Sequence, residues 1–206
     1  MKKIILSIVP LMIIGYFVSG CSPKAEYERM LKHELASGVR HDSLFLGLYL
    51  GMSDKDFYTH CWKLNRNGLV IQGSTNTTVE YRTKDELKYT CNMNFYPSFV
   101  NGKISELPVR FIYTGWAPWN KELSADKLQI DVLNWCKKKY MVDFMIVEHP
   151  TKGLAYVNIS GNRRISIFKE DEMHVWAVFT DILVKNELSD STKVVANPID
   201  NIKDAK

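Results

Sequence analysis

The sequence lacks the patterns that mark several common chemistries. It has no Cys-x-x-Cys pair, no His-x-x-x-His pair, no Gly-x-Ser-x-Gly elbow and no glycine-rich phosphate loop. A zinc ribbon, a thioredoxin-type centre, a serine-hydrolase elbow and a nucleotide cradle therefore have no support. Basic runs of five or more residues are also missing, and 27 Lys and Arg stand against 23 Asp and Glu. Nucleic acid is therefore not an expected partner.

Two local clusters carry residue types used in catalysis or metal binding. His41-Asp42-Ser43 supplies the three residue types of a hydrolase triad. A triad, however, needs residues that the fold brings together, and sequence neighbours rarely form one. Residues 170–172 (Glu-Asp-Glu) lie between two expected strands and are interpreted as a solvated hairpin tip. The sequence thus predicts no catalytic residue, no metal site and no cofactor.

The N-terminal segment has the layout of a targeting signal. Lys2 and Lys3 precede an apolar stretch over residues 4–18, which is shorter than the roughly 20 residues that span a bilayer comfortably. Small residues follow, and Cys21 comes directly after them. Residues 1–20 are therefore expected to be a secretory signal peptide. The alternative is an uncleaved anchor, which would have no use for the small-small-Cys ending.

The end of this segment, Val18-Ser19-Gly20-Cys21, resembles the lipobox of bacterial lipoproteins. The resemblance implies that Cys21 starts the mature chain and carries a diacylglyceryl thioether and an N-acyl group such as palmitate. Two or more acyl chains hold a protein stably at a membrane. Ser22 stands where an aspartate retains enterobacterial lipoproteins at the inner membrane, and residues 22–25 carry no acidic export run. We therefore expect anchoring at the outer membrane, facing the periplasm.

Residues 21–40 are expected to be the lipidated N-terminus and a helical tether. Tyr27, Met30, Leu31 and Leu35 share one helical stripe, and Gly38 is a plausible end of the helix. The tether would lie between the lipid and the folded domain.

Two further helices are predicted, each followed by strands. Ser53 is a good N-cap for a helix that ends near residues 67–68, and Ser124 is a good N-cap for a second helix. Asn101-Gly102 is a hairpin signal. The last predicted strand is apolar on both faces, which indicates a central place in the sheet. Residues 44–50 are expected to be a short strand or a packed lead-in to the domain. Alternation or apolar runs predict strands over 69–72, 77–83, 87–95, 107–114, 143–148, 155–160, 163–169 and 173–184.

Helices ahead of consecutive strands indicate an α+β fold with helices packed on an antiparallel sheet. The domain is expected over residues 41–185, as two consecutive helix-then-strands units at about 41–115 and 120–185. Residues 186–206 lose periodicity and become polar, so we expect a flexible tail there.

Residues 50–57 (Leu-Gly-Met-Ser-Asp-Lys-Asp-Phe) resemble the opening of small bacterial envelope lipoproteins. The family resembled is the small lipoprotein subunit of the outer-membrane barrel-assembly machinery, where a Gly-Met-Thr/Ser signal begins the helix. The resemblance implies a β-lactamase-inhibitor-like fold. It covers about eight residues, and residues 116–184 have no counterpart in that family. The chain also resembles envelope lipoproteins of gut-type diderm bacteria with no known activity.

Three cysteines follow the lipobox: Cys61, Cys91 and Cys136. All fall on apolar faces, and an oxidising envelope permits a disulfide. Buried free thiols and a single bridge both remain open. If one bridge forms, Cys61–Cys91 is the expected pair, because a helix and its following strand should pack together.

Two triplets, Asp42-Ser43-Leu44 and Asp190-Ser191-Thr192, resemble the acceptor sites of one bacterial O-glycosylation system. The resemblance implies glycosylation at Ser43 and Ser191. The alternative is a pair of solvated loop residues.

The best candidate for a binding function is the aromatic loop with Tyr113, Trp116 and Trp119 beside Pro118. Exposed tryptophans would stack on sugar rings or anchor a protein partner, whereas buried ones would fill the seam between the two halves.

The leading hypothesis is a lipid-anchored, non-catalytic envelope protein that binds another envelope protein or has a structural role. The alternative is a glycan-binding module that uses Trp116 and Trp119. An enzyme with an unrecognised site is the third hypothesis.

Overall fold

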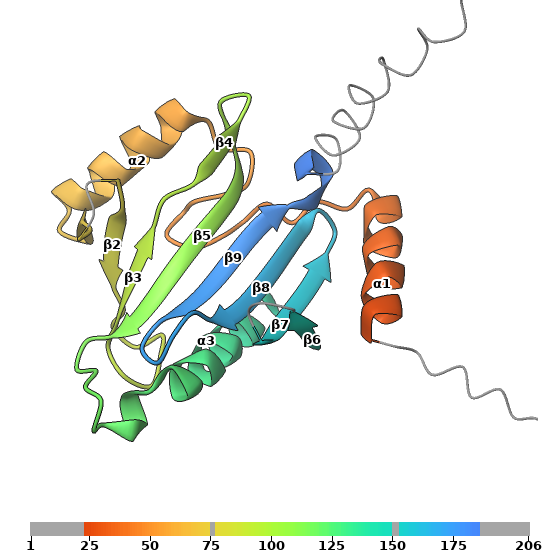
Figure 1. Cartoon of the computed structure of the whole chain (residues 1–206). Coiled ribbons are helices and arrows are strands. Elements are labelled where there is room, and N and C mark those ends of the chain that lie inside the picture. The colour runs from red at the N-terminus through yellow and green to blue at the C-terminus, as the bar shows by residue number, and fades with distance from the viewer. Residues whose placement is uncertain (1–22, 75–76, 150–152, 186–206) are drawn as a thin grey trace, which may run out of the picture.

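One antiparallel sheet dominates the molecule (Figure 1). The computed structural model describes residues 23–74, 77–149 and 153–185. Nine strands within these ranges form the sheet, in the order β1-β2-β3-β5-β9-β8-β7-β6, with β4 paired to β5 outside this path. The mixed class of helices and antiparallel sheet is confirmed, and β9 lies in the middle of the sheet, as its two apolar faces predicted.

Along the chain, α2 precedes β1–β5 and α3 precedes β6–β9, yet the strands join one sheet; the division into two units stays a prediction. The helices are α1 (Pro23–Ser37), α2 (Asp54–Arg66), the short 3-10 helix η1 (Lys121–Leu123) and α3 (Ala125–Tyr140). The strands are β1 (Val70–Gln72), β2 (Val79–Arg82), β3 (Cys91–Phe95), β4 (Ser98–Val100), β5 (Lys103–Tyr113), β6 (Met145–His149), β7 (Gly153–Ser160), β8 (Arg163–Lys169) and β9 (Val175–Asp181).

The main core lies between one face of the sheet and the helices α2 and α3. Successive side chains of a strand point to opposite faces, so aligned residues form rows across the sheet. One such row joins Met93, Phe111 and Val175, all almost completely buried. Phe57 of α2 and Leu128 of α3 are buried in the same cluster. Full burial of each such side chain stabilises the fold by roughly 1.5–3 kcal/mol.

The start of α2 follows the prediction. The Ser53 Oγ accepts a hydrogen bond of 3.1 Å from the Asp56 backbone N–H, as an N-cap side chain does. Asp54 and Asp56 place negative charge in the first turn, where the helix dipole favours it.

Most strand bounds shift by a few residues from the sequence prediction; β5, for instance, begins at Lys103 and not at 107. Residues 44–50 are the packed lead-in and not a strand: they form turns and one isolated bridge, with Leu46 and Gly47 at positive φ. Strand β3 begins at Cys91, because Thr83 Oγ1 accepts the Cys91 N–H and the preceding residues form a separate loop. Residues 98–100, which lie outside the predicted strands, form β4. The turn is then only Asn101-Gly102, both at positive φ, as a two-residue hairpin turn requires.

Helix α1 packs on the sheet face opposite the main core. In β7, Tyr156 points to the main core, whereas Ala155, Val157 and Ile159 form a second cluster. The apolar side chains of α1 that cover this cluster are the predicted stripe: Tyr27, Met30, Leu31 and Leu35. The stripe is confirmed, but the described part of the expected tether is not a spacer, because it lies on the domain beside β7 (Figure 1).

Asn162, in the turn between β7 and β8, is 1% exposed and is saturated with hydrogen bonds. Its Oδ1 accepts the His41 N–H at 2.7 Å, and its Nδ2 donates to Asp42 Oδ1 at 2.8 Å and to Asp181 Oδ2 at 3.2 Å. Its backbone N–H donates to Val39 O. These bonds hold the segment 39–42 against the ends of β7, β8 and β9, and we call this arrangement the Asn162 clamp.

Gly161 completes the clamp. Its N–H donates to Glu34 Oε2 at 2.7 Å and so ties the end of α1 to the same turn. Its φ is +55°, and a Cβ built there would lie 2.4 Å from Val39 O. Only glycine allows the segment 39–42 to approach this closely.

We predict that Gly161→Ala destabilises the fold more than Gly102→Ala, which is the matched control. Both glycines have positive φ, but a Cβ at Gly102 meets no atom within 4 Å. The control should lower the free energy of unfolding by about 1 kcal/mol through backbone strain alone. Gly161→Ala should lower it by about 3 kcal/mol or more, because steric overlap adds to the strain. Urea denaturation measures both, and equal losses would contradict the close approach.

Candidate functional site

A cleft of about 750 Å³ opens where the loop after β5, the start of α3 and the β8–β9 hairpin meet. Trp116 and Pro118 form its apolar side. We call it the Trp116 cleft. The remaining lining residues are mostly polar or charged: Ala117, Asn120, Lys121, Ser124, Ala125, Asp126, Lys127, Lys169, Glu170, Asp171 and Glu172.

Two contacts fix the walls of the cleft. The Ala125 N–H donates to Glu172 O at 2.9 Å, and Lys169 forms an ion pair with Asp126. Together they join the first turn of α3 to the hairpin. Ser124 is the N-cap residue, as predicted, but its hydroxyl makes no capping hydrogen bond and instead forms part of the cleft lining.

The three aromatic residues of the predicted binding loop have different environments. Tyr113 is 2% exposed and its hydroxyl donates to Asp131, so it belongs to the core. Burial, with Asp131 beside it, raises the pKa of Tyr113. Trp116 is half-buried in the cleft wall, whereas Trp119 is 84% exposed and is not part of the lining. Of the three, the structure places only Trp116 in the cleft.

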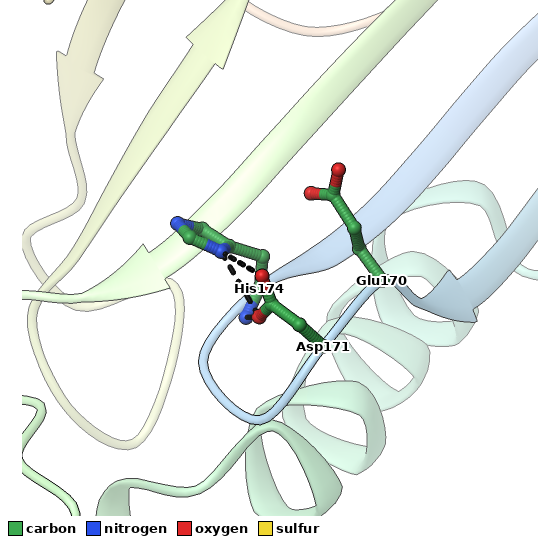
Figure 2. A group of neighbouring side chains, drawn as sticks. All are labelled: Glu170, Asp171 and His174. Atoms are coloured by element: carbon green, nitrogen blue, oxygen red, sulfur yellow. Dashed lines mark hydrogen bonds and ion pairs between the residues drawn. The ribbon is translucent and has the colours of Figure 1, made fainter.

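An acidic group with a histidine lies at the hairpin end of the cleft (Figure 2). Each of these residues, Glu170, Asp171 and His174, offers one side-chain atom that could bind a metal ion, and the three atoms lie within 4.8 Å of one another. His174 Nδ1 lies 2.8 Å from Asp171 Oδ2. Burial opposes ionisation of Asp171, but hydrogen bonds from His174 and from the backbone N–H groups of residues 173 and 174 outweigh it and lower the Asp171 pKa.

The Arg110 guanidinium already supplies the positive charge in this group. Its Nε donates to Glu170 Oε2 at 2.7 Å, and its Nη2 lies 3.1 Å from His174 Nδ1. A metal cation binding to Glu170 and His174 would have to displace or repel this guanidinium. The arrangement therefore acts as an ion-pair network that holds the hairpin to β5.

The three cysteines in the described part of the chain, Cys61, Cys91 and Cys136, are free thiols, which is one of the two alternatives that the sequence left open. The other alternative, a Cys61–Cys91 bridge, does not form. Helix α2, which carries Cys61, packs beside β1, whereas Cys91 lies on β3, two strands further into the sheet. Burial raises the pKa of Cys61 to about 11 and also raises the pKa values of the other two thiols.

The other predicted modification sites are placed only in part. Ser43 is exposed, and its backbone O accepts a hydrogen bond from Arg163. Cys21 and Ser191 lie outside the described residues. No helix within the described ranges is long and apolar enough to cross a membrane.

The sequence did not reveal that Asp126, Lys169 and Glu172 share one cleft with Trp116. A helix N-cap and an acidic turn were recognisable at positions 124 and 170–172. More than forty residues separate them, and no local periodicity indicates that they meet. The exposed Trp62 on α2 was also not singled out; it is 60% exposed.

No family model matches the chain, and neither a curated protein nor a solved structure was found to be similar to it. The lipobox and the resemblance of residues 50–57 therefore stay predictions from the sequence.

We predict that the three thiols react with a thiol reagent only after unfolding. With a pKa of about 11, Cys61 is roughly 0.1% thiolate at pH 8, and the other two are more deeply buried. Thiol titration of the mature chain without a reductant should give slow reaction in buffer and three thiols in guanidinium. A count of one in guanidinium would reveal a disulfide.

Proposed function

We propose that the chain is a lipid-anchored protein of the bacterial cell envelope whose domain binds carbohydrate, without catalysis, in the Trp116 cleft. One observation carries this proposal: a half-buried indole lines an open cleft in which four of the seven charged lining residues form ion pairs. Ligand sites typically combine an aromatic or apolar wall with a few polar groups that fix orientation.

The charge pairing favours a neutral ligand rich in hydroxyl groups. Lys169 pairs with Asp126, Glu170 with Arg110, and Asp171 with His174. A strongly charged ligand would have to compete with these pairs. Sugar hydroxyls can instead hydrogen-bond to the same side chains, while the C–H face of the ring stacks on Trp116.

The position of α1 supports anchoring of the domain directly at a membrane. Pro23, the first residue of α1, follows Cys21 by two positions, which is at most about 7 Å of extended chain. Because α1 is packed on the sheet, lipid on Cys21 would hold the whole domain at the bilayer surface. Ser22 favours the outer membrane and the periplasmic side.

The hydrogen bonds of His174 support a non-catalytic role. The His174 Nδ1 lies within hydrogen-bond distance of Asp171 and Arg110, and no hydrogen bond that the described residues make joins the ring to a serine or cysteine nucleophile. A histidine base needs such a partner for nucleophilic catalysis.

We also propose that the domain consists of two helix-then-strands units, α2 with β1–β5 and α3 with β6–β9, that share one sheet.

We predict that Cys21→Ala abolishes lipidation. In the wild-type chain, the peptide that begins at Cys21 should carry the mass of the acyl groups. The Cys21→Ala variant should keep residues 1–20 and carry no acyl groups. Mass spectrometry of the purified membrane protein measures both. Cys61→Ala serves as the control and should be lipidated normally. A free thiol at position 21 in the mature chain would contradict the anchor.

We predict that Trp116→Ala weakens carbohydrate binding by at least about tenfold, as loss of an aromatic anchor typically does. A glycan array probed with the full chain in detergent identifies the sugar, and calorimetry with that sugar gives the affinity. Trp62→Ala is the matched control, because this exposed tryptophan lies on α2 and not in the cleft lining. Binding to no glycan, or equal affinity of both variants, would contradict the proposal.

A further inference from the structure

The two edge strands of the sheet, β1 and β6, differ in length and in the contacts that their backbone makes. Strand β1 has three residues, lies beside α2, and its Val70 O accepts a hydrogen bond of 2.9 Å from Asn65 Nδ2. Strand β6 has five residues and contacts α1 through one face, but it pairs only with β7 and has no strand on its outer side among the described residues. An unprotected edge offers backbone N–H and C=O groups to another extended segment.

Apolar side chains flank this open edge. On the α3 side of the sheet, Ile146 of β6 is 55% exposed and Leu154 of β7 is 61% exposed. Ile130 of α3 is 43% exposed and follows Gln129, whose amide donates to Leu154 O. On the other side, Met145 and Val147 are half-buried against the second core cluster under α1. We call β6 and these flanking residues the β6 edge.

We propose that the β6 edge pairs with the β6 edge of a second copy of this chain. An edge strand in antiparallel pairing is complementary to itself, and a twofold axis at Val147 would place Ile146 opposite Glu148 of the second copy. The two Ile146 side chains would then be diagonal neighbours on the α3 side. The two Val147 side chains would lie opposite each other on the α1 side and extend the second core cluster.

The position of α1 favours a second copy over another partner. The twofold axis of an antiparallel strand pair runs normal to the sheet, so both α1 helices lie on the same face of the joined sheet. Both lipidated N-termini can therefore reach one membrane. This last step rests on the proposed lipid anchor, whereas the strand pairing itself does not depend on it or on the Trp116 cleft.

Cysteine cross-linking of Val147→Cys tests the pairing in the full chain in its own membranes. A short bis-maleimide or copper-catalysed oxidation should convert this variant to a species of twice the chain mass on a non-reducing gel. Ile71→Cys is the matched control, because Ile71 is 57% exposed on the opposite edge strand; it should stay monomeric, as should the unmodified chain with its buried or half-buried cysteines.

A second variant separates specific pairing from random collision. Adding Ile146→Glu to Val147→Cys should lower the dimer yield about tenfold, because it places a glutamate opposite Glu148 of the second copy, and does so twice in a symmetric pair. Circular dichroism melts should show that both variants fold. A monomeric Val147→Cys, a yield unaffected by Ile146→Glu, or a cross-linked species of any other mass would overturn the proposal. The same membranes, tested for acylation at Cys21 and for glycan binding, show separately whether the proposed function holds.

Discussion

The Asn162 clamp is the interaction on which the rest of the structure depends. Asp181, at the end of the central strand β9, is 1% exposed, and a buried carboxylate is tolerated only when it is paired and hydrogen-bonded. Asn162 Nδ2 and the Arg40 guanidinium supply these partners, the latter at 3.0 Å. Asn162 lies in the β7–β8 turn and Arg40 lies in the segment 39–42. The hydrogen bonds to the buried Asp181 carboxylate therefore hold this turn, this segment and the end of β9 together.

The clamp orders the chain on both sides of it. Toward the N-terminus, Glu34 ties α1 to Gly161, so the apolar stripe of α1 stays on β7. Toward the C-terminus, the segment after residue 43 enters the main core. There the Phe45 ring contacts Phe95 edge-on, with 5.2 Å between ring centroids, and Phe179 at a tilt, with 6.0 Å between centroids. The sheet assembled on this core carries the β8–β9 hairpin to the start of α3, and the Trp116 cleft lies where they meet.

Features governed by local physics could be predicted from the sequence. The N-cap at Ser53, the Asn101-Gly102 turn and the α1 stripe each follow from the chemistry of a few neighbouring residues. Tyr113 could have been placed correctly as well, since it continues the alternation of Leu107, Val109 and Phe111 into the core. The cleft could not, because its walls come from segments that only the sheet topology brings together. The choice of Cys61–Cys91 as the pair for a possible bridge rested on chain order, and the strand order does not make α2 and β3 neighbours.

The Asn162 clamp joins α1 and the sheet into one body. Hydrogen–deuterium exchange of the full chain tests it most directly, because exchange reports the free energy of opening for each segment. We predict that backbone amides of α1 are protected to the same degree as those at the end of β7, and that both lose protection together in Asn162→Ala. Exchange of α1 at the rate of a free helix, while β7 stays protected, would contradict the account.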